Sequence, residues 1–399
     1  MEQNATKSTA PIPIWRATLS AASASLVGIG LARFAYPPLL PAIIDARWFS
    51  ASQAAYLGAA NLAGYLLGVL FANHLARRTS ARAVLRAMMS LTALAICACA
   101  WPTSFSWFFI WRLASGMGGG AIMILAAPAV LSHVPASRRG GTSGLIFMGI
   151  GVGVAAAGTL VPLLLRQGLT QAWLGIGIAC LILTAVAWSG WPDPVKATGT
   201  LGEAPRKPRS SPALWGLYAE YGLNAFGLVP HMIFLVVFVA RGLGQGLEAG
   251  AFYWVLFGLG AVVGPLANGH LADRLGFRTA LRLAFGVQAA AILAPSLDHS
   301  APTLIISSLL MGAATPGIVP LVLGRVHELA GHDPDAQRVA WRAATTAFAC
   351  AQALAGYAMS FLLARMGGDY ALLFELGSGS VVFALLIDIV ANRRTKKSR

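Results

Sequence analysis

The chain has 399 residues, of which 57% are hydrophobic and only 11% are charged, with a mean hydropathy of +0.69. A soluble domain has about 25% charged residues, so these numbers exclude a surface that faces water throughout and predict an integral membrane protein. The formal net charge of +15 would favour nucleic-acid binding in a soluble protein, whereas basic cytoplasmic loops account for it in a membrane protein.

Apolar stretches long enough to cross the hydrocarbon layer recur along almost the whole chain. A Pro-, Gly-, Ser- and Lys/Arg-rich segment, which we expect to be a flexible linker, interrupts them midway. We therefore predict an all-α integral membrane protein with an N-terminal six-helix half at 1–191, a cytoplasmic linker at 192–212 and a C-terminal six-helix half at 213–399. The predicted spans lie near 16–43, 52–73, 83–101, 107–131, 141–165, 170–191, 213–240, 249–271, 280–297, 302–324, 339–364 and 370–391.

The basic residues fall almost entirely on one side of this predicted topology. With the N-terminus in the cytoplasm, 23 Lys and Arg residues lie on the cytoplasmic side and 4 on the other, while Arg33 and Arg112 lie within spans. The positive-inside rule then places both termini and the linker on the cytoplasmic side of a cell inner membrane. The same distribution removes the need for a nucleic-acid partner. We expect a monomer whose partners are membrane lipid and a small-molecule substrate.

The two halves repeat each other at a shift of 196 residues. The repeat includes a basic loop after the second and eighth spans. It also includes two glycines in each of these spans and one glycine in each of the fourth and tenth spans. Parallel six-span repeats of this kind are a known architecture of membrane transporters. The matched pairs are His74 with His270, Arg78 with Arg274, Arg82 with Arg278, Arg86 with Arg282, Gly64 with Gly260, Gly68 with Gly264, and Gly116 with Gly312.

Three short motifs stand out along the chain. The loop at 269–278 reads GHLADRLGFR, and its first-half counterpart has Arg77 in place of the acid and Ser80 in place of the second glycine. The fourth span contains RLASG at 112–116, and the first span reads GIGLARFAYPPLLP at 28–41.

The loop and the fourth-span motif resemble two signatures of the major facilitator superfamily, roughly G-x-x-x-D-R-x-G-R-[RK] and R-x-x-Q-G, with Ser115 here replacing the glutamine. The first span resembles the YbfB-like branch of that superfamily, and the resemblance covers essentially the whole chain. The fifth span contains four glycines between 149 and 158 but lacks the Gly-Pro pair of the superfamily's drug antiporters, which weakens a multidrug-antiporter interpretation.

The resemblance implies twelve helices in two pseudo-symmetric halves, with spans 1, 4, 7 and 10 lining a central cavity. Such proteins work by alternating access, in which the halves rock about a site near the midplane. The resemblance also implies that the loop containing Asp273, Arg274 and Arg278 is a gating loop that helps to hold one access state.

Arg33 and Arg112 are the strongest candidates for substrate contact. An ionisable side chain inside a span costs about 2.5–3.5 kcal/mol on insertion scales, so it normally faces a cavity or a partner. At 1.5 Å per residue, both lie roughly 9–13 Å from the outer boundary. Two guanidinium groups at similar depth predict a site for a carboxylate or another anion. Alternatively, Arg112 is a structural or proton-coupling residue of its motif.

Several uncharged polar residues within spans either line the pocket or join helices. Of these, Tyr36 and Asn224 are predicted substrate-binding residues. The full set comprises Tyr36, Asn61, Tyr65, Tyr221, Asn224 and Gln352.

Glu220 and His231, both in the seventh span, are the candidates for proton coupling. Glu220 is the deepest acid in the chain and lies about eight residues inside the span; alternatively, it is a static partner of an Arg or Tyr. His231 matches Arg33 at a shift of 198, and histidine titrates near physiological pH. We predict that His231 lies at the cavity and also contacts substrate, the alternative being a hydrogen-bonded packing residue.

We predict no catalytic residue, no metal site and no cofactor, because the sequence has no P-loop, no nucleophile elbow and no recognised metal-ligand spacing. The sequence therefore predicts a non-enzymatic secondary active transporter of a small organic solute, expected to be an anion and coupled to protons. Two alternatives stay open: an efflux antiporter for varied amphipathic compounds, and a non-transporting membrane sensor or assembly factor on a carrier fold.

Overall fold

The computed structural model describes residues 12–135, 138–192, 211–331, 333–367 and 369–397. Residues 193–210 of the predicted linker and the extreme termini lie outside this description. Within it, twelve helical segments are long and apolar enough to cross a membrane, which confirms the predicted number. The chain is thus an all-α membrane protein, as composition indicated.

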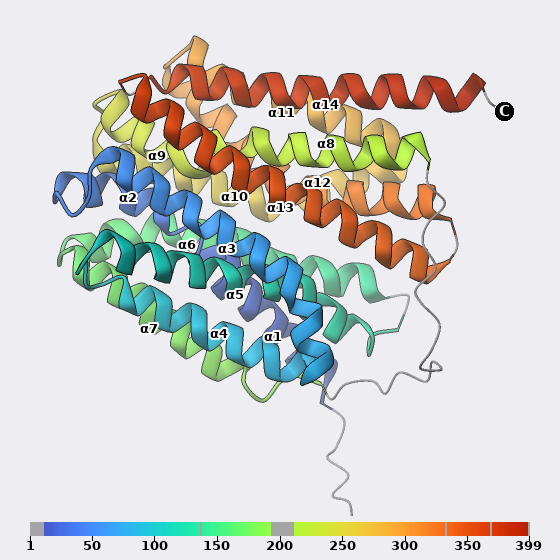
Figure 1. The fold of residues 1–399 in the computed structure, drawn as a ribbon, viewed down its shortest axis with the longest axis horizontal. Coiled ribbons are helices and arrows are strands. Elements are labelled where there is room, and N and C mark those ends of the chain that lie inside the picture. The colour runs from blue at the N-terminus through green and yellow to red at the C-terminus, as the bar shows by residue number, and fades with distance from the viewer. Residues whose placement is uncertain (1–11, 136–137, 193–210, 332, 368, 398–399) are drawn as a thin grey trace, which may run out of the picture.

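The helices of the two halves form two groups that lie side by side, the N-terminal half below the C-terminal half in Figure 1. The first and seventh spans are each made of several segments that include π-helical turns (η). The first half contains α1 (Ile14–Ser25), η1 (Leu26–Leu31), α2 (Tyr36–Asp45), α3 (Ala51–Arg78), α4 (Ala81–Ala98), α5 (Phe105–Leu131), α6 (Arg139–Leu165) and α7 (Leu169–Ala187). The second half contains α8 (Pro212–Val229), η3 (Pro230–Phe234), α9 (Leu235–Val237), η4 (Phe238–Gly242), α10 (Gly246–Leu275), α11 (Phe277–Leu297), α12 (Ala301–Ala330), α13 (Pro334–Arg365) and α14 (Ala371–Lys397).

Serine residues define where several of these helices begin. The hydroxyl groups of Ser50, Ser80, Ser104 and Ser211 each accept a hydrogen bond from the backbone N–H three residues later, at the starts of α3, α4, α5 and α8. Each hydroxyl satisfies one of the backbone N–H groups that lack a partner in the first turn. These caps set where four of the spans begin.

The predicted repeat is visible in how helices touch within each half. A Cβ atom on Gly64 of α3 would collide with the carbonyl oxygen of Leu113 in α5, and one on Gly260 of α10 would collide with that of Leu309 in α12. Both partners are related by the same shift of 196 residues. The remaining matched collisions are Gly68 with Met117 and Gly264 with Ala313, and Gly116 with Asn61 and Gly312 with Phe257. The second and fourth spans of each half therefore cross at the same contact, where only glycine allows the backbones to approach.

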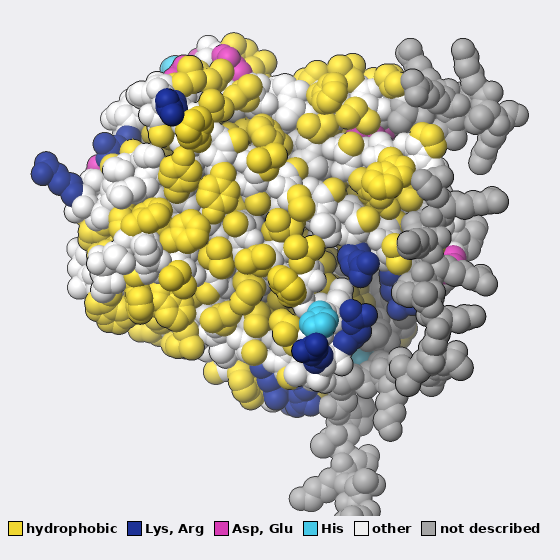
Figure 2. Space-filling model, viewed as in Figure 1, with side chains coloured by type: hydrophobic (Ala, Val, Ile, Leu, Met, Phe, Trp, Pro, Cys, Tyr) yellow, Lys and Arg dark blue, Asp and Glu magenta, His cyan; other side chains and the backbone are white. Residues whose placement is uncertain are grey.

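The outer surface is apolar, as a lipid-facing surface requires. Figure 2 shows hydrophobic side chains over most of one face, with most of the Lys and Arg side chains toward one end. That end carries the C-terminus of α7 and the start of α8 (Figure 1), and we call it the linker end. The halves contact each other mainly through α3 against α13 and α6 against α10.

Candidate functional site

A cavity of about 510 Å³ lies between the two halves. Its deep end contains Arg33, Tyr65 and Gln352, and it extends to His270 and Asp273 near the end of α10, at the linker end. Most of its lining is apolar, with side chains from the first span, α3, α5, α6, the seventh span, α10, α12 and α13. A concave, mostly apolar site with a few polar groups is typical of small-molecule binding.

The opposite end of the cavity is closed by contacts between the halves. The indole N–H of Trp254 in α10 donates to the carbonyl oxygen of Phe34 at 2.8 Å, and the Trp254 ring stacks on Phe257 with centroids 4.8 Å apart. Further out, Arg241 pairs with Asp45 at 2.7 Å. The cavity is therefore accessible from the linker end and blocked at the other.

Two prolines explain why this part of the first span offers carbonyl groups to other helices. Pro37 and Pro38 have no N–H, so the carbonyl groups of Arg33 and Phe34 lose their usual helical donors four residues later. The Tyr36 N–H bonds to the Arg33 carbonyl at 3.4 Å, which leaves the Ala32 carbonyl free as well. Trp254 then satisfies Phe34, and Arg112 satisfies Ala32. The Pro-Pro sequence thus opens the helix beside Arg33.

Arg33 lies in this opened segment and reaches the cavity. Its side chain is nine-tenths buried, one guanidinium nitrogen donates to Gln352 Oε1 at 3.0 Å, and the group lies 4.2 Å from the centroid of the Tyr65 ring. Among the described residues, Gln352 supplies its single hydrogen-bond acceptor and no carboxylate is within ion-pairing distance. A guanidinium has five N–H donors, so Arg33 has donors to spare for a ligand in the cavity.

Arg112 and Tyr36, by contrast, are turned into the N-terminal half and do not line the cavity. The Arg112 guanidinium donates to the carbonyl oxygens of Ala32 at 2.9 Å and Leu57 at 3.4 Å, and lies 4.2 Å from the Tyr36 ring centroid. The Tyr36 hydroxyl donates to the Ala54 carbonyl at 2.6 Å. These contacts match the structural alternative considered for Arg112.

The two other predicted contacts in the seventh span lie away from the cavity lining. The Asn224 amide donates to Gln288 Oε1 of α11 at 2.6 Å. His231 Nε2 lies 2.9 Å from the Ser307 hydroxyl, while Nδ1 has no partner among the described residues. Both side chains are fully buried between helices of the C-terminal half. A shift of 198 matches His231 to Arg33 in sequence, but the local helix geometry turns the two side chains in different directions.

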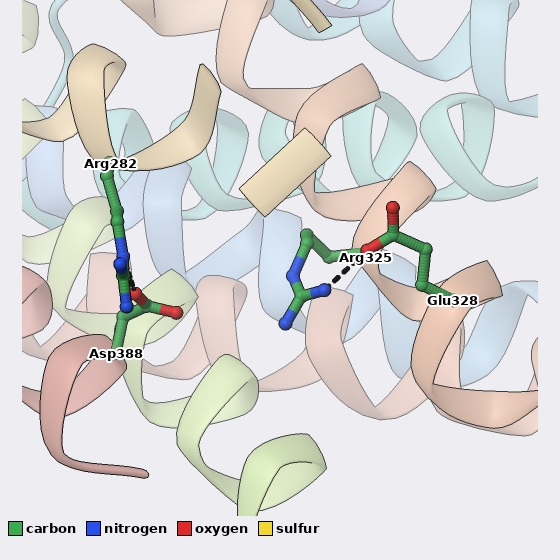
Figure 3. A network of polar contacts seen from close by, with 4 residues as sticks. All are labelled: Arg282, Arg325, Glu328 and Asp388. Atoms are coloured by element: carbon green, nitrogen blue, oxygen red, sulfur yellow. Dashed lines mark hydrogen bonds and ion pairs between the residues drawn. The ribbon is translucent and has the colours of Figure 1, made fainter. Parts of the chain in front are cut away.

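Glu220 is buried in α8, one residue before the cavity-lining Tyr221. It does not itself line the cavity. Its electrostatic neighbours are Arg278 and Arg282 from α11, Arg325 from α12 and Asp388 from α14. With Glu328, which pairs with Arg325, they form a charged cluster at the linker end of the C-terminal half. Figure 3 shows the two ion pairs of this cluster, Arg282 with Asp388 and Arg325 with Glu328.

The predicted gating loop combines two environments. Asp273 lines the mouth of the cavity and Arg274 is exposed, whereas Arg278 belongs to the charged cluster. Gly276 has a φ of +78°, a conformation that favours glycine. In the first half the corresponding Ser80 is extended and caps α4 instead, which explains why that copy of the loop has no glycine.

Tyr65, Tyr221 and Gln352 line the cavity, although only Tyr36 and Asn224 were selected from the polar residues within spans. All six were visible in the sequence as polar groups in apolar stretches. A buried helix is apolar on most sides, so the pattern did not indicate which side faces the cavity.

The architecture is shared with solved membrane transporters. A crystal structure described as a D-xylose-proton symporter superposes with a TM-score of 0.73, at 17% sequence identity, over 94% of this chain and 97% of that chain. A partially occluded inward-open structure of the xylose transporter XylE from E. coli gives a TM-score of 0.72, at 14% identity, over 94% and 96% of the two chains. At these identities the likeness establishes the fold alone.

Residues 25–389 match the sequence profile of a family described as uncharacterised MFS-type transporter YbfB. The chain belongs to this family, which confirms the expected resemblance, and the family is described as one of transporters. It is also 28% identical over 273 residues to the probable transporter SCO4007 of Streptomyces coelicolor. That alignment covers 64% of this chain and 61% of the relative.

Proposed function

We propose that the protein is a secondary active transporter that moves a small organic anion across the cell inner membrane, coupled to protons, by alternating access. The observation that supports an anionic substrate is the environment of Arg33. This residue is a cation in the cavity between the halves, with spare N–H donors and no carboxylate partner among the described residues. A cation that lacks a protein counter-ion in a largely apolar site favours a ligand that brings the missing charge.

Alternating access is supported by the asymmetry of the cavity. The linker end is open, and the charge distribution of the sequence puts that end in the cytoplasm. The arrangement then corresponds to an inward-facing state. Asp273 of the predicted gating loop lines the open mouth, and closure of the halves would move this loop toward the N-terminal half.

Proton coupling is proposed at Glu220. Its carboxyl group is buried close to three arginines and one aspartate, and Glu220 lies on the same helix, α8, that presents Tyr221 to the cavity. A proton taken up or released by Glu220 changes the net charge of the cluster. It therefore changes the electrostatic attraction between the helices that carry the charged side chains. His231 is the weaker candidate because its Nε2 is occupied by Ser307.

The test is uptake by proteoliposomes containing the full chain. Organic acids are supplied outside with an inward proton gradient, internal solute is measured by mass spectrometry, and internal pH is followed with an entrapped dye. We expect at least one acid to accumulate faster than in protein-free vesicles, with acidification of the interior, and we expect Arg33→Ala to abolish the difference. Uptake that Arg33→Ala leaves unchanged would refute the anion site, and the absence of any protein-dependent uptake would refute transport.

A second function, export of varied amphipathic compounds, is favoured by the largely apolar lining of the cavity, including Phe147, Met232 and Phe348. It differs in one measurable respect. An exporter of this kind accepts neutral and cationic compounds as readily as anions, so competition by such compounds would support it over the anion carrier.

A further inference from the structure

We propose that the substrate is a monocarboxylate with a sizeable apolar body, such as an aromatic ring. This inference rests on the proposed function and specifies which anion the cavity accepts. It joins two observations, a single deep cation at Arg33 and an apolar lining, which separately favour an anion and an amphipathic compound.

One cation matches one negative charge. Arg112 lies close enough to act on Arg33 electrostatically, but its donors are committed to backbone carbonyls and it does not line the cavity. The charged residue at the mouth, Asp273, is acidic and repels a second carboxylate placed toward that end. A dianion would therefore bring one charge into the cavity without a partner, which is costly in an apolar site.

Two hydroxyl groups of the lining already donate within their own helices and are poorly suited to a polyhydroxylated solute. Thr315 and Thr345 both line the cavity, but their hydroxyls donate to the carbonyls of Met311 and Trp341 in their own helices, at 2.8 and 2.9 Å. A sugar whose hydroxyls lose water and find no partner pays the full desolvation cost of each group. An apolar body has no such desolvation cost, and its transfer from water into the cavity is favourable in free energy.

In this structure Gln352 occupies the position next to Arg33 that we assign to the substrate carboxylate. Its side-chain oxygen accepts from Arg33, while its amide nitrogen donates to the Met232 sulfur, a weak acceptor, at 3.5 Å. A neutral amide oxygen binds a guanidinium less strongly than a carboxylate does. A substrate carboxylate can therefore share or replace this bond, and its body then extends from Arg33 toward Phe147, Leu266 and Phe348.

The experiment measures binding to the purified full chain from ligand-dependent shifts in thermal unfolding, which report the dissociation constant by mass action. The probes are phenylalkanoates from phenylacetate to 6-phenylhexanoate, with 3-phenylpropanamide as the uncharged match, acetate as the match without a body, and succinate and D-xylose as other classes. We expect some member of the phenylalkanoate series to bind at least tenfold more tightly than every control compound.

Three variants test the roles of the residues. Arg33→Ala is expected to weaken the best phenylalkanoate about a hundredfold, the equivalent of two charge-assisted hydrogen bonds. Gln352→Glu supplies an internal carboxylate and is expected to weaken it at least tenfold, whereas Gln352→Leu should leave affinity equal or tighter. Arg365→Gln, which removes an exposed arginine at the other end of α13, is the control for loss of one positive charge and should change nothing.

Equal binding of the amide, tighter binding of succinate or D-xylose, or no binding anywhere in the series would each overturn the proposed substrate class. Equal losses for Gln352→Glu and Gln352→Leu would overturn the role of Gln352. Protein-dependent uptake of a solute of another class in proteoliposomes would leave the transport function standing while this inference fails, so the two failures are distinguishable.

Discussion

Arg33 and Arg112 each lie 4.2 Å from the centroid of a tyrosine ring, yet their hydrogen-bond partners differ. Arg112 donates to the Ala32 carbonyl, which the broken first span leaves available, and to the Leu57 carbonyl of α3, and so it joins three helices. Arg33 donates to one neutral side chain of the other half. These contacts support the proposal that Arg112, with fixed backbone partners, is structural and that Arg33, with spare donors at the cavity, binds substrate.

Arg112→Lys is expected to lower the stability of the protein without weakening substrate binding. Lysine cannot donate to both carbonyls in the planar geometry of arginine, so at least one buried carbonyl loses its partner, at a cost of about 1–3 kcal/mol. Thermal unfolding in detergent measures the loss. The matched variant Arg33→Lys should do the reverse, with a small change in stability and a large loss of affinity. A stable Arg112→Lys variant with impaired binding would return Arg112 to the substrate site.

Glu220→Gln is expected to separate solute exchange from proton movement. Glutamine keeps the shape of the side chain but binds no proton, so solute-driven acidification should disappear while exchange of labelled for unlabelled solute continues. Glu328→Gln is the control, because Glu328 is a partly exposed member of the same cluster, and it should keep both activities. If Glu220→Gln still acidifies the vesicles at the normal rate, the coupled proton binds elsewhere.

At the scale of the helices, glycines decide how closely the spans approach. The glycine-rich fifth span, α6, uses two sides. Gly149 and Gly153 meet the backbone of the first span, while Gly151 and Gly158 meet the backbone of α10 in the other half. α6 therefore packs tightly against its own half on one side and forms a contact between the halves on the other. We propose that this contact is a surface along which the halves rock.

Gly264→Ala is expected to destabilise the protein by about 1–3 kcal/mol, because its Cβ would collide with the backbone of Ala313 in α12 and force the helices apart. Gly68→Ala, its counterpart in the first half, should have a similar effect. Gly286→Ala in α11 is the control, since nothing lies within 4 Å of the added carbon, and it should be neutral or slightly stabilising. The three variants are compared by their melting temperatures. Equal values would show that the crossings tolerate a methyl group.

At the scale of the whole molecule, the closed end is held by contacts of different strength. The buried bond from Trp254 to the Phe34 carbonyl is shielded from water. The pair of Arg241 with Asp45 has side chains that are 41% and 66% exposed, so it contributes at most about 1 kcal/mol. A difference of that size does not lock a conformation, but it changes the ratio of two states roughly fivefold.

Asp45→Asn is therefore expected to shift the population toward opening at this end. Spin labels are attached at positions 46 and 245, which are Ala46 and Gln245 in the protein, in a variant without native cysteines. Double electron–electron resonance spectroscopy then measures the distance between the two labels, and so between the halves. The long-distance fraction should rise in Asp45→Asn and in Arg241→Gln, and the exchanged pair Asp45→Arg with Arg241→Asp should restore the short distance. Unchanged distance distributions in both single variants would exclude a role for the pair in closure.

The orientation in the membrane gives a further prediction. The 23-to-4 distribution of basic residues predicts that the linker faces the cytoplasm. A cysteine at Thr200, outside the described residues, should react with an impermeant thiol reagent only after cells are permeabilised. A cysteine at Thr103, in the exposed loop before α5, should react in intact cells. The opposite pattern would invert the topology and make the described state outward-facing.

The sequence by itself determined that the protein crosses the membrane twelve times, that its halves repeat, and that it belongs to a transporter family. These conclusions depend on hydrophobicity and on residues at fixed spacings, which are properties of the chain. The residues of the site were harder to predict. Arg33 was placed at the cavity by both approaches, whereas Tyr36, Arg112, Asn224 and His231 are packed between helices.

Only the tertiary structure decided which polar side chains face the cavity. Helix rotation in a membrane depends on packing against neighbouring helices, because lipid and protein interiors are both apolar and hydrophobicity does not orient a buried span. The π-helical turns and the Pro37–Pro38 break also change the direction of side chains along the first and seventh spans. The partners that separate Arg33 from Arg112, namely Gln352 in one case and the carbonyls of Ala32 and Leu57 in the other, come together only when both halves are packed.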